Sequence, residues 1–75
     1  MIIELSRSSF LQALGQARQG QWILYHVGWL MGDRPKSRRL NAMAHEVWAR
    51  HELGEVELKQ RRLGDQLYEY YAMKL

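Results

Sequence analysis

Basic side chains give the clearest chemical signal in this sequence, because seven of the eleven Lys and Arg residues fall in two short clusters. Clustered cations bind anions, above all the phosphates of nucleic acids. The first cluster lies before and at the start of a predicted helix, and the second lies in the first strand of a predicted hairpin. The clusters are Arg34, Lys36, Arg38 and Arg39, and Lys59, Arg61 and Arg62.

The first cluster is unusual for a helix start. Aligned peptide dipoles place partial positive charge at a helix N-terminus, so cations are unfavourable there. The cluster therefore indicates an anionic partner, which exposed backbone N–H groups would also bind. An ordinary solvated helix start explains the cluster equally well. If the partner is DNA, we expect Arg38, Arg39, Asn41 and His45 to face it, with Asn41 as the candidate for reading an adenine edge.

The second cluster lies opposite two tyrosines. In the expected register, Lys59 pairs with Tyr70 and Arg61 with Tyr68, on the face that we assign to solvent. Cations beside aromatic rings hold phosphates while the rings stack on bases. The alternative is a set of ordinary cross-strand pairs, in which the basic stems cover the tyrosines. Three acidic neighbours oppose a phosphate contact here and would restrict it to the hairpin tip. These are Glu55, Glu57 and Glu69.

Patterns for catalysis or metal binding are not found. His45-Glu46 and His51-Glu52 resemble parts of the H-E-x-x-H zinc signature, but histidines at this spacing point about 120° apart on a helix. The sequence has no cysteine, no nucleophile elbow and no phosphate-binding glycine loop. We therefore predict no catalytic residue, no metal and no cofactor, and a protein that is not an enzyme.

Two helices are expected to position the basic residues. Residues 7–18 show a helical apolar face that starts at Ser9, in a capping box with Gln12, or one turn earlier at Ser6. The second helix has Ser37 as its N-cap and Gly54 as its C-cap after Leu53. Its apolar side is expected to be buried. This side consists of Leu40, Met43, Ala44, Val47, Trp48 and His51.

Three strands complete the prediction. Residues 21–27 are mostly aromatic or aliphatic between two glycines, which predicts a largely buried strand. Residues 55–74 predict a hairpin with a type II′ turn at Gly64-Asp65. That turn pairs Leu63 with Gln66 and Leu58 with Tyr71. It places four residues on the core face, which are Val56, Leu58, Tyr71 and Met73.

The order helix, strand, helix, strand, strand predicts an α+β class with a three-stranded antiparallel sheet. We expect residues 1–75 to form a single winged-helix-like domain, in which a helix leads into a C-terminal β-hairpin that serves as the wing. One departure is the short connection at residues 28–35. It has room for the additional helix of a helix-turn-helix pair only if Leu30 to Arg34 forms a single turn.

Composition places the chain among small globular proteins: 75 residues, a net charge of +3 and 47% hydrophobic residues. The absence of cysteine fits a cytoplasmic location. No signal peptide is expected, because Glu4 interrupts the apolar start after Ile2 and Ile3. The apolar stretch around Trp22 to Met31 is far shorter than the roughly 20 residues that cross a membrane, so no membrane association is expected.

Two segments resemble short proteins encoded by tailed bacteriophages and bacterial prophages. The first is the G-x-W-x-x-Y-H-x-G pattern at residues 20–28. The second is residues 56–64, read Val-Glu-Leu-Lys-Gln-Arg-Arg-Leu-Gly, followed by Tyr-Glu-Tyr-Tyr-Ala at residues 68–72. The resembled group has no settled activity, so the resemblance implies a bacterial or phage-infected cell as the context and carries no site residues.

Two roles follow from this context. The first is a small regulatory protein that binds nucleic acid, most naturally DNA. The second is an interaction module that binds and modulates a host bacterial protein, for which the three Trp and four Tyr residues and the apolar segment Trp29-Leu30-Met31 would supply contacts. Either role allows a homodimer, although no heptad pattern specifies one.

Overall fold

The computed structural model describes residues 5–75, and the segment Ile2 to Glu4 lies outside the described residues. The elements follow the order helix, strand, two short helical turns, helix, strand, strand. They are α1 (Arg7–Gln16), β1 (Trp22–Gly28), α2 (Leu30–Asp33), the 3₁₀ turn η1 (Arg34–Lys36), α3 (Arg38–Glu52), β2 (Val56–Gly64) and β3 (Leu67–Lys74). The predicted α+β class with its C-terminal hairpin is confirmed.

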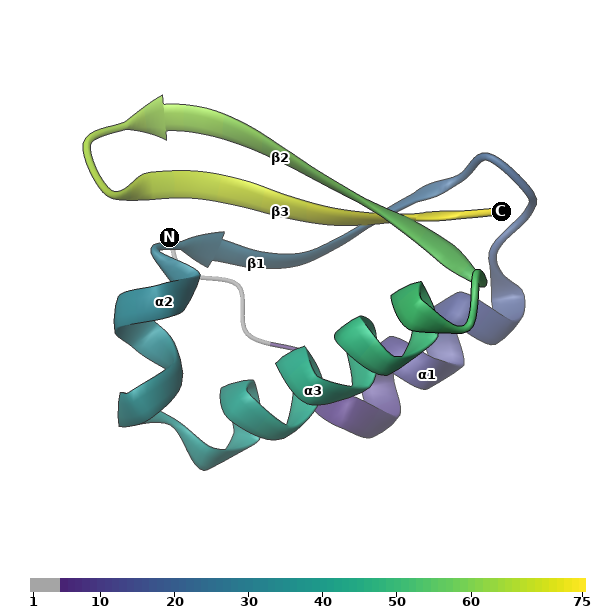
Figure 1. Cartoon of the computed structure of the whole chain (residues 1–75), viewed down its shortest axis with the longest axis horizontal. Helices are drawn as coiled ribbons and strands as arrows, with labels where there is room; N and C mark the ends of the chain where they lie inside the picture. The colour runs from purple at the N-terminus through teal and green to yellow at the C-terminus, as the bar shows by residue number, and fades with distance from the viewer. Residues whose placement is uncertain (1–4) are drawn as a thin grey trace.

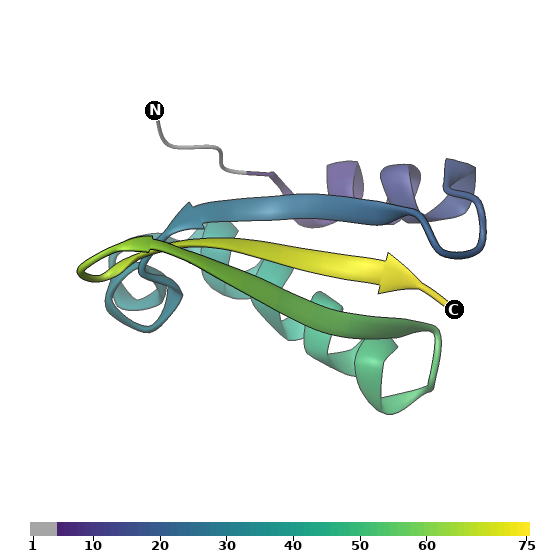
Figure 2. The same ribbon diagram turned by 90° about the horizontal axis from the view of Figure 1, so that it is seen from above.

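The three strands form one antiparallel sheet in the order β1-β3-β2, so the last strand lies in the middle. Helices α1 and α3 both cover the same face of this sheet (Figure 1), and the view from above shows the sheet in front of them (Figure 2). The core lies between the two layers. Its largest fully buried side chains include Phe10, Leu40, Met43, Val47 and Val56.

The connection before α3 forms the single turn on which the winged-helix-like prediction depended. Leu30–Asp33 makes one α-helical turn and continues into η1, which contains Pro35. Ser37 then breaks the helical path with φ −143° and caps α3, because its Oγ accepts a hydrogen bond from the backbone N–H of Leu40. The predicted N-cap is confirmed, and Gly54 adopts a left-handed φ of +76° beyond the helix end, as predicted.

One of the two predicted starts of α1 is confirmed, and two other details of the helices differ from the prediction. Helix α1 is capped by Ser6, the earlier of the two predicted starts, whose Oγ accepts from the N–H of Ser9, so Ser9 lies inside the helix and makes no capping box. The helix ends at Gln16, two residues earlier than expected. Trp48 is 54% exposed, because it lies at the edge of the apolar stripe of α3 beside the sheet.

The hairpin register is shifted by one residue from the prediction. Gly64 pairs with Leu67, so the turn residues are Asp65 and Gln66, and Gln66 takes the left-handed φ of +52°. An irregularity between Arg62 and Gly64 absorbs one residue. The predicted Gly64-Asp65 turn and its pairs are therefore wrong. The observed pairs are Leu58 with Ala72, Lys59 with Tyr71, Gln60 with Tyr70, Arg61 with Glu69, and Arg62 with Tyr68.

This shift exchanges the two faces of β3, because successive strand residues point to opposite sides. Tyr70 and Ala72 face the core and are 8% and 0% exposed. Tyr71 and Met73, which were predicted to be core residues, lie on the face away from the helices. Val56 and Leu58 of β2 face the core as predicted.

Candidate functional site

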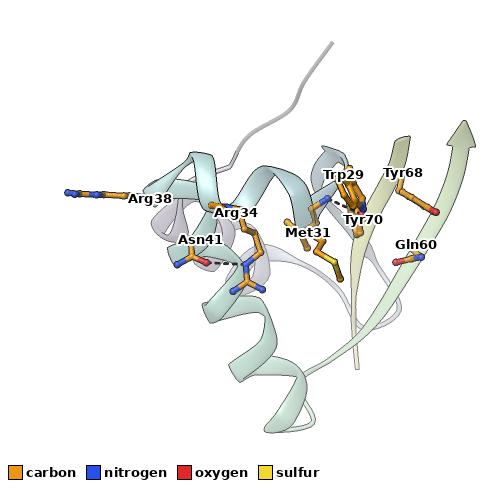
Figure 3. A pocket seen from close by; sticks show the side chains of 10 residues that line it. Trp29, Met31, Arg34, Arg38, Asn41, Gln60, Tyr68 and Tyr70 are labelled. Atoms are coloured by element: carbon orange, nitrogen blue, oxygen red, sulfur yellow. Dashed lines mark hydrogen bonds between the residues drawn. The ribbon is translucent and has the colours of Figure 1, made fainter. Parts of the chain in front are cut away.

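A groove of about 730 Å³ lies where the start of α3, the short helix α2 and the hairpin meet. Figure 3 shows side chains from all three elements around it. The lining combines aromatic rings, two arginines and two amides, and none of its residues is acidic. The lining residues are Trp29, Leu30, Met31, Arg34, Pro35, Arg38, Asn41, Gln60, Tyr68 and Tyr70.

Helix α2 is held against β1 by the carboxylate of Asp33. Asp33 Oδ2 accepts hydrogen bonds from His26 Nε2 at 2.8 Å and from the backbone N–H of Trp29 at 3.0 Å. His26 is only 2% exposed, so this bond satisfies a buried nitrogen. Gly28 makes the approach possible: a Cβ there would lie 2.6 Å from Asp33 Oδ2, and its φ of +142° disfavours any other residue.

Tyr70 fixes the other side of the same turn. Its hydroxyl accepts a hydrogen bond of 3.0 Å from the backbone N–H of Leu30, and its ring packs against Tyr25 and His26. Burial raises the pKa of the neighbouring Tyr25 to about 12, with Tyr70 adding to the rise and Arg34 opposing it. Tyr70 is therefore a buried structural residue at the base of the groove, rather than the solvent-facing ring that was predicted.

Trp29 forms one wall of the groove, and Gly32 determines where its ring lies. The ring packs directly over Gly32, so closely that a Cβ at this position would collide with it. Gly28 pairs with Tyr68 across β1 and β3, which brings Trp29 and Tyr68 to the same end of the sheet. Trp29 is 38% exposed and Tyr68 is half-buried, so both rings are accessible from solvent.

The first basic cluster is exposed and largely unpaired. Lys36, Arg38 and Arg39 are exposed, and within residues 5–75 none of them makes an ion pair with a carboxylate. Arg34 is half-buried and donates through Nε to Asn41 Oδ1 at 3.1 Å (Figure 3). The guanidinium of Arg38 extends away from the groove in the same view. The cluster thus presents uncompensated positive charge beside the groove.

The second basic cluster is divided between the two faces of the hairpin, and each of its members is paired. Lys59 and Arg61 lie on the face away from the helices, with partners Glu57 at 3.4 Å and Glu69 at 2.6 Å. Arg62 lies on the helix side near the tip and pairs with Asp65 at 2.7 Å. The predicted pairing of Lys59 with Tyr70 and of Arg61 with Tyr68 is wrong, and Arg62 lies opposite Tyr68 instead.

Asn41 and His45 lie on α3 but differ in position. Asn41 borders the groove, and its Oδ1 is already engaged by Arg34, so reading an adenine edge through both amide atoms would require this bond to be exchanged. His45 is exposed one turn further along and lies outside the groove lining. Of the predicted site residues, Arg34, Arg38 and Asn41 therefore border the same groove as Tyr68.

Sequence reasoning missed the contribution of Trp29, Met31 and Gln60 to this site. Trp29 and Met31 were considered only as contacts for a host protein, and Met31 is 76% exposed. The signal that could have identified them is the apolar character of residues 29–31. This segment connects the buried strand to the basic cluster, so its side chains must lie near the start of α3. The sequence gives no such signal for Gln60, because the hairpin register determines which face of the sheet its side chain occupies.

Within the described part of the chain, no group of three or more His, Asp or Glu side chains is arranged to hold a metal ion, and no helix has the length and apolar character needed to cross a membrane. Comparison of the chain with protein-family models, with curated proteins and with solved structures finds no match.

Proposed function

We propose that this protein is a small winged-helix-like, DNA-binding regulatory protein that acts in the cytoplasm of a bacterial or phage-infected cell. Helix α3 approaches the duplex with its N-terminal end, and the tip of the hairpin, including Arg62, lies alongside the flanking backbone. Phosphate contacts supply most of the affinity in such a complex and set its orientation.

The observation that supports this proposal is that the two basic clusters differ in whether their cations form ion pairs with carboxylates. Lys36, Arg38 and Arg39 have no carboxylate partner in residues 5–75, whereas Lys59, Arg61 and Arg62 are each paired. Unpaired cations at a helix start add to the repulsion from the helix dipole, and phosphates would relieve it. The hairpin tip lies at the same end of the molecule (Figure 1), so both elements can contact one partner.

The proposal is tested by fluorescence anisotropy of a labelled 20-base-pair duplex at several salt concentrations. The logarithm of the association constant should fall linearly with the logarithm of salt, with a slope of about −0.9 for each phosphate neutralised. Arg38→Ala/Arg39→Ala should weaken binding at least tenfold and make the slope shallower by about 1.8.

Lys59→Ala/Arg61→Ala is the matched control, because it removes the same charge from paired residues on the other face of the sheet. This control should change the affinity less than threefold. Equal losses in the two double variants would show that only net charge matters, and no binding at low salt would disprove the proposal.

A second candidate function is the binding of a host bacterial protein, and it is favoured by the uncovered face of the sheet. Trp22 is 51% exposed on this face and contacts Tyr71 edge-on, at 5.3 Å between ring centroids. Exposed aromatic rings are common anchors of protein interfaces. Capture of one defined protein from nuclease-treated bacterial lysate, lost in Trp22→Ala but retained in Arg38→Ala/Arg39→Ala, would support this role.

A further inference from the structure

The groove between α2 and the hairpin has walls that are already in place in the free protein. The ring of Trp29 rests on Gly32, and α2 itself is held by Asp33 and by the hydroxyl of Tyr70. Tyr68 borders the same groove from β3, next to Tyr70 at 5.9 Å between ring centroids. A volume of about 730 Å³ is in the range of sites for small ligands.

The polar groups of the groove select the chemistry of its occupant. Gln60 contributes an exposed amide and Arg34 a guanidinium, the guanidinium of Arg38 points outward beside the groove, and the lining contains no carboxylate. Such a lining disfavours cations. It accepts a planar group that has hydrogen-bond donors and acceptors on its edge and that is attached to a negatively charged group outside the groove. A nucleobase on its sugar-phosphate chain has these properties, because its faces stack on aromatic rings and its phosphates pair with arginine.

We infer that this groove takes one unpaired base of a nucleic acid, stacked against Trp29 and Tyr68, while Arg34 and Arg38 contact the adjoining phosphates. The inference rests on the proposed function and extends it: the preferred ligand is a duplex that carries an unpaired nucleotide, such as a single-stranded overhang. A fully paired duplex would occupy the basic cluster and leave the groove empty.

The test compares two labelled probes of one sequence, a blunt 20-base-pair duplex and the same duplex with a five-nucleotide overhang. The overhang probe should bind at least tenfold more tightly, since stacking of one base contributes about that factor. With 2-aminopurine in the overhang, binding should also quench the fluorescence of this base, which reports stacking without any change to the protein.

Two variants from different elements locate the effect, Trp29→Leu and Tyr68→Leu. Each should bring the affinity ratio of the two probes close to one and leave blunt-duplex affinity within about threefold of the unmodified protein. Trp22→Leu, on the opposite face of the sheet, is the matched control and should retain the preference. Thermal melting of each variant checks that it is folded.

The outcomes separate the inference from the proposal beneath it. Equal affinity for both probes, or a preference that persists in both groove variants, overturns the inference and leaves duplex binding intact. Binding of the overhang probe without binding of the blunt duplex overturns the proposed function and supports the groove as a base site. Failure to bind either probe at low salt overturns both.

Discussion

His26 and Asp33 are joined by a hydrogen bond of 2.8 Å between Nε2 and Oδ2, and this bond connects the buried sheet to the turn that precedes α3. Because a carboxylate only accepts hydrogen bonds, Nε2 of the imidazole carries the proton. The same oxygen accepts the backbone N–H of Trp29, so a single atom positions both the strand and the groove wall. The geometry of the proposed nucleic-acid site therefore depends on a residue that does not line it.

Replacing Asp33 should weaken the fold. Asp33→Ala removes both hydrogen bonds and leaves a buried imidazole nitrogen without a partner, which should lower the free energy of unfolding by about 2–3 kcal/mol. Urea denaturation should show a lower midpoint with an unchanged slope. Asp65→Ala is the control, because Asp65 is 97% exposed at the hairpin tip, and it should change stability by less than about 0.5 kcal/mol. Equal effects of the two substitutions would contradict the role assigned to Asp33.

Two glycines should respond to alanine in opposite directions. Gly32→Ala places a methyl group against the ring of Trp29 and should destabilise the protein by about 1–2 kcal/mol. Displacement of the ring into solvent should shift tryptophan emission to the red. Gly15 in α1 has no atom within 4 Å of the added methyl, so Gly15→Ala should stabilise by about 0.5–1 kcal/mol through helix propensity. A neutral Gly32→Ala with unchanged emission would show that the ring is not held.

Stability should fall in acid because of Glu46. Hydrogen bonds from Arg50, and then from Arg7, hold the pKa of this carboxyl below its usual value of 4.5. A depressed folded-state pKa gives stability that is present above pH 4.5 and is lost as the pH falls through the folded value.

Glu46→Gln should therefore be less stable than the unmodified protein at pH 7, and the difference should shrink below about pH 4.5. Urea denaturation between pH 7 and pH 3 measures this difference. Glu52→Gln is the control, since Glu52 is exposed on the same helix and makes no ion pair within residues 5–75. Parallel pH profiles for Glu46→Gln and the unmodified protein would rule out the effect.

Local signals in the sequence were sufficient to predict the two longer helices and the fold class. Ser37 before the apolar stripe and Gly54 after it mark the ends of α3, because capping depends on the few residues around each end. The hairpin register could not be predicted in this way. Gly64 offered the usual turn residue, but the chain turns one residue later with Gln66 in the left-handed region. That single step determines which tyrosines reach the core.

The groove depends on contacts that lie far apart in the sequence. Trp29 and Tyr68 come together only because Gly28 pairs with Tyr68 across the sheet. The ion pairs of the basic residues also depend on distant contacts, since Arg61 lies next to Glu69 only in the observed hairpin register. The sequence predicted which residues carry charge, and it could not predict which of those charges are already neutralised.

The position of β3 between β1 and β2 has a consequence for synthesis. Neither outer strand can pair until residues 67–74 have left the ribosome, because β3 is the neighbour of both. The nascent chain therefore carries two unpaired strands and the uncovered apolar sides of α1 and α3. Tyr70 and Ala72 complete the core in the same step that closes the sheet. Closure of the sheet should be a single event that waits for β3, and until then the nascent polypeptide is open to chaperones and proteases.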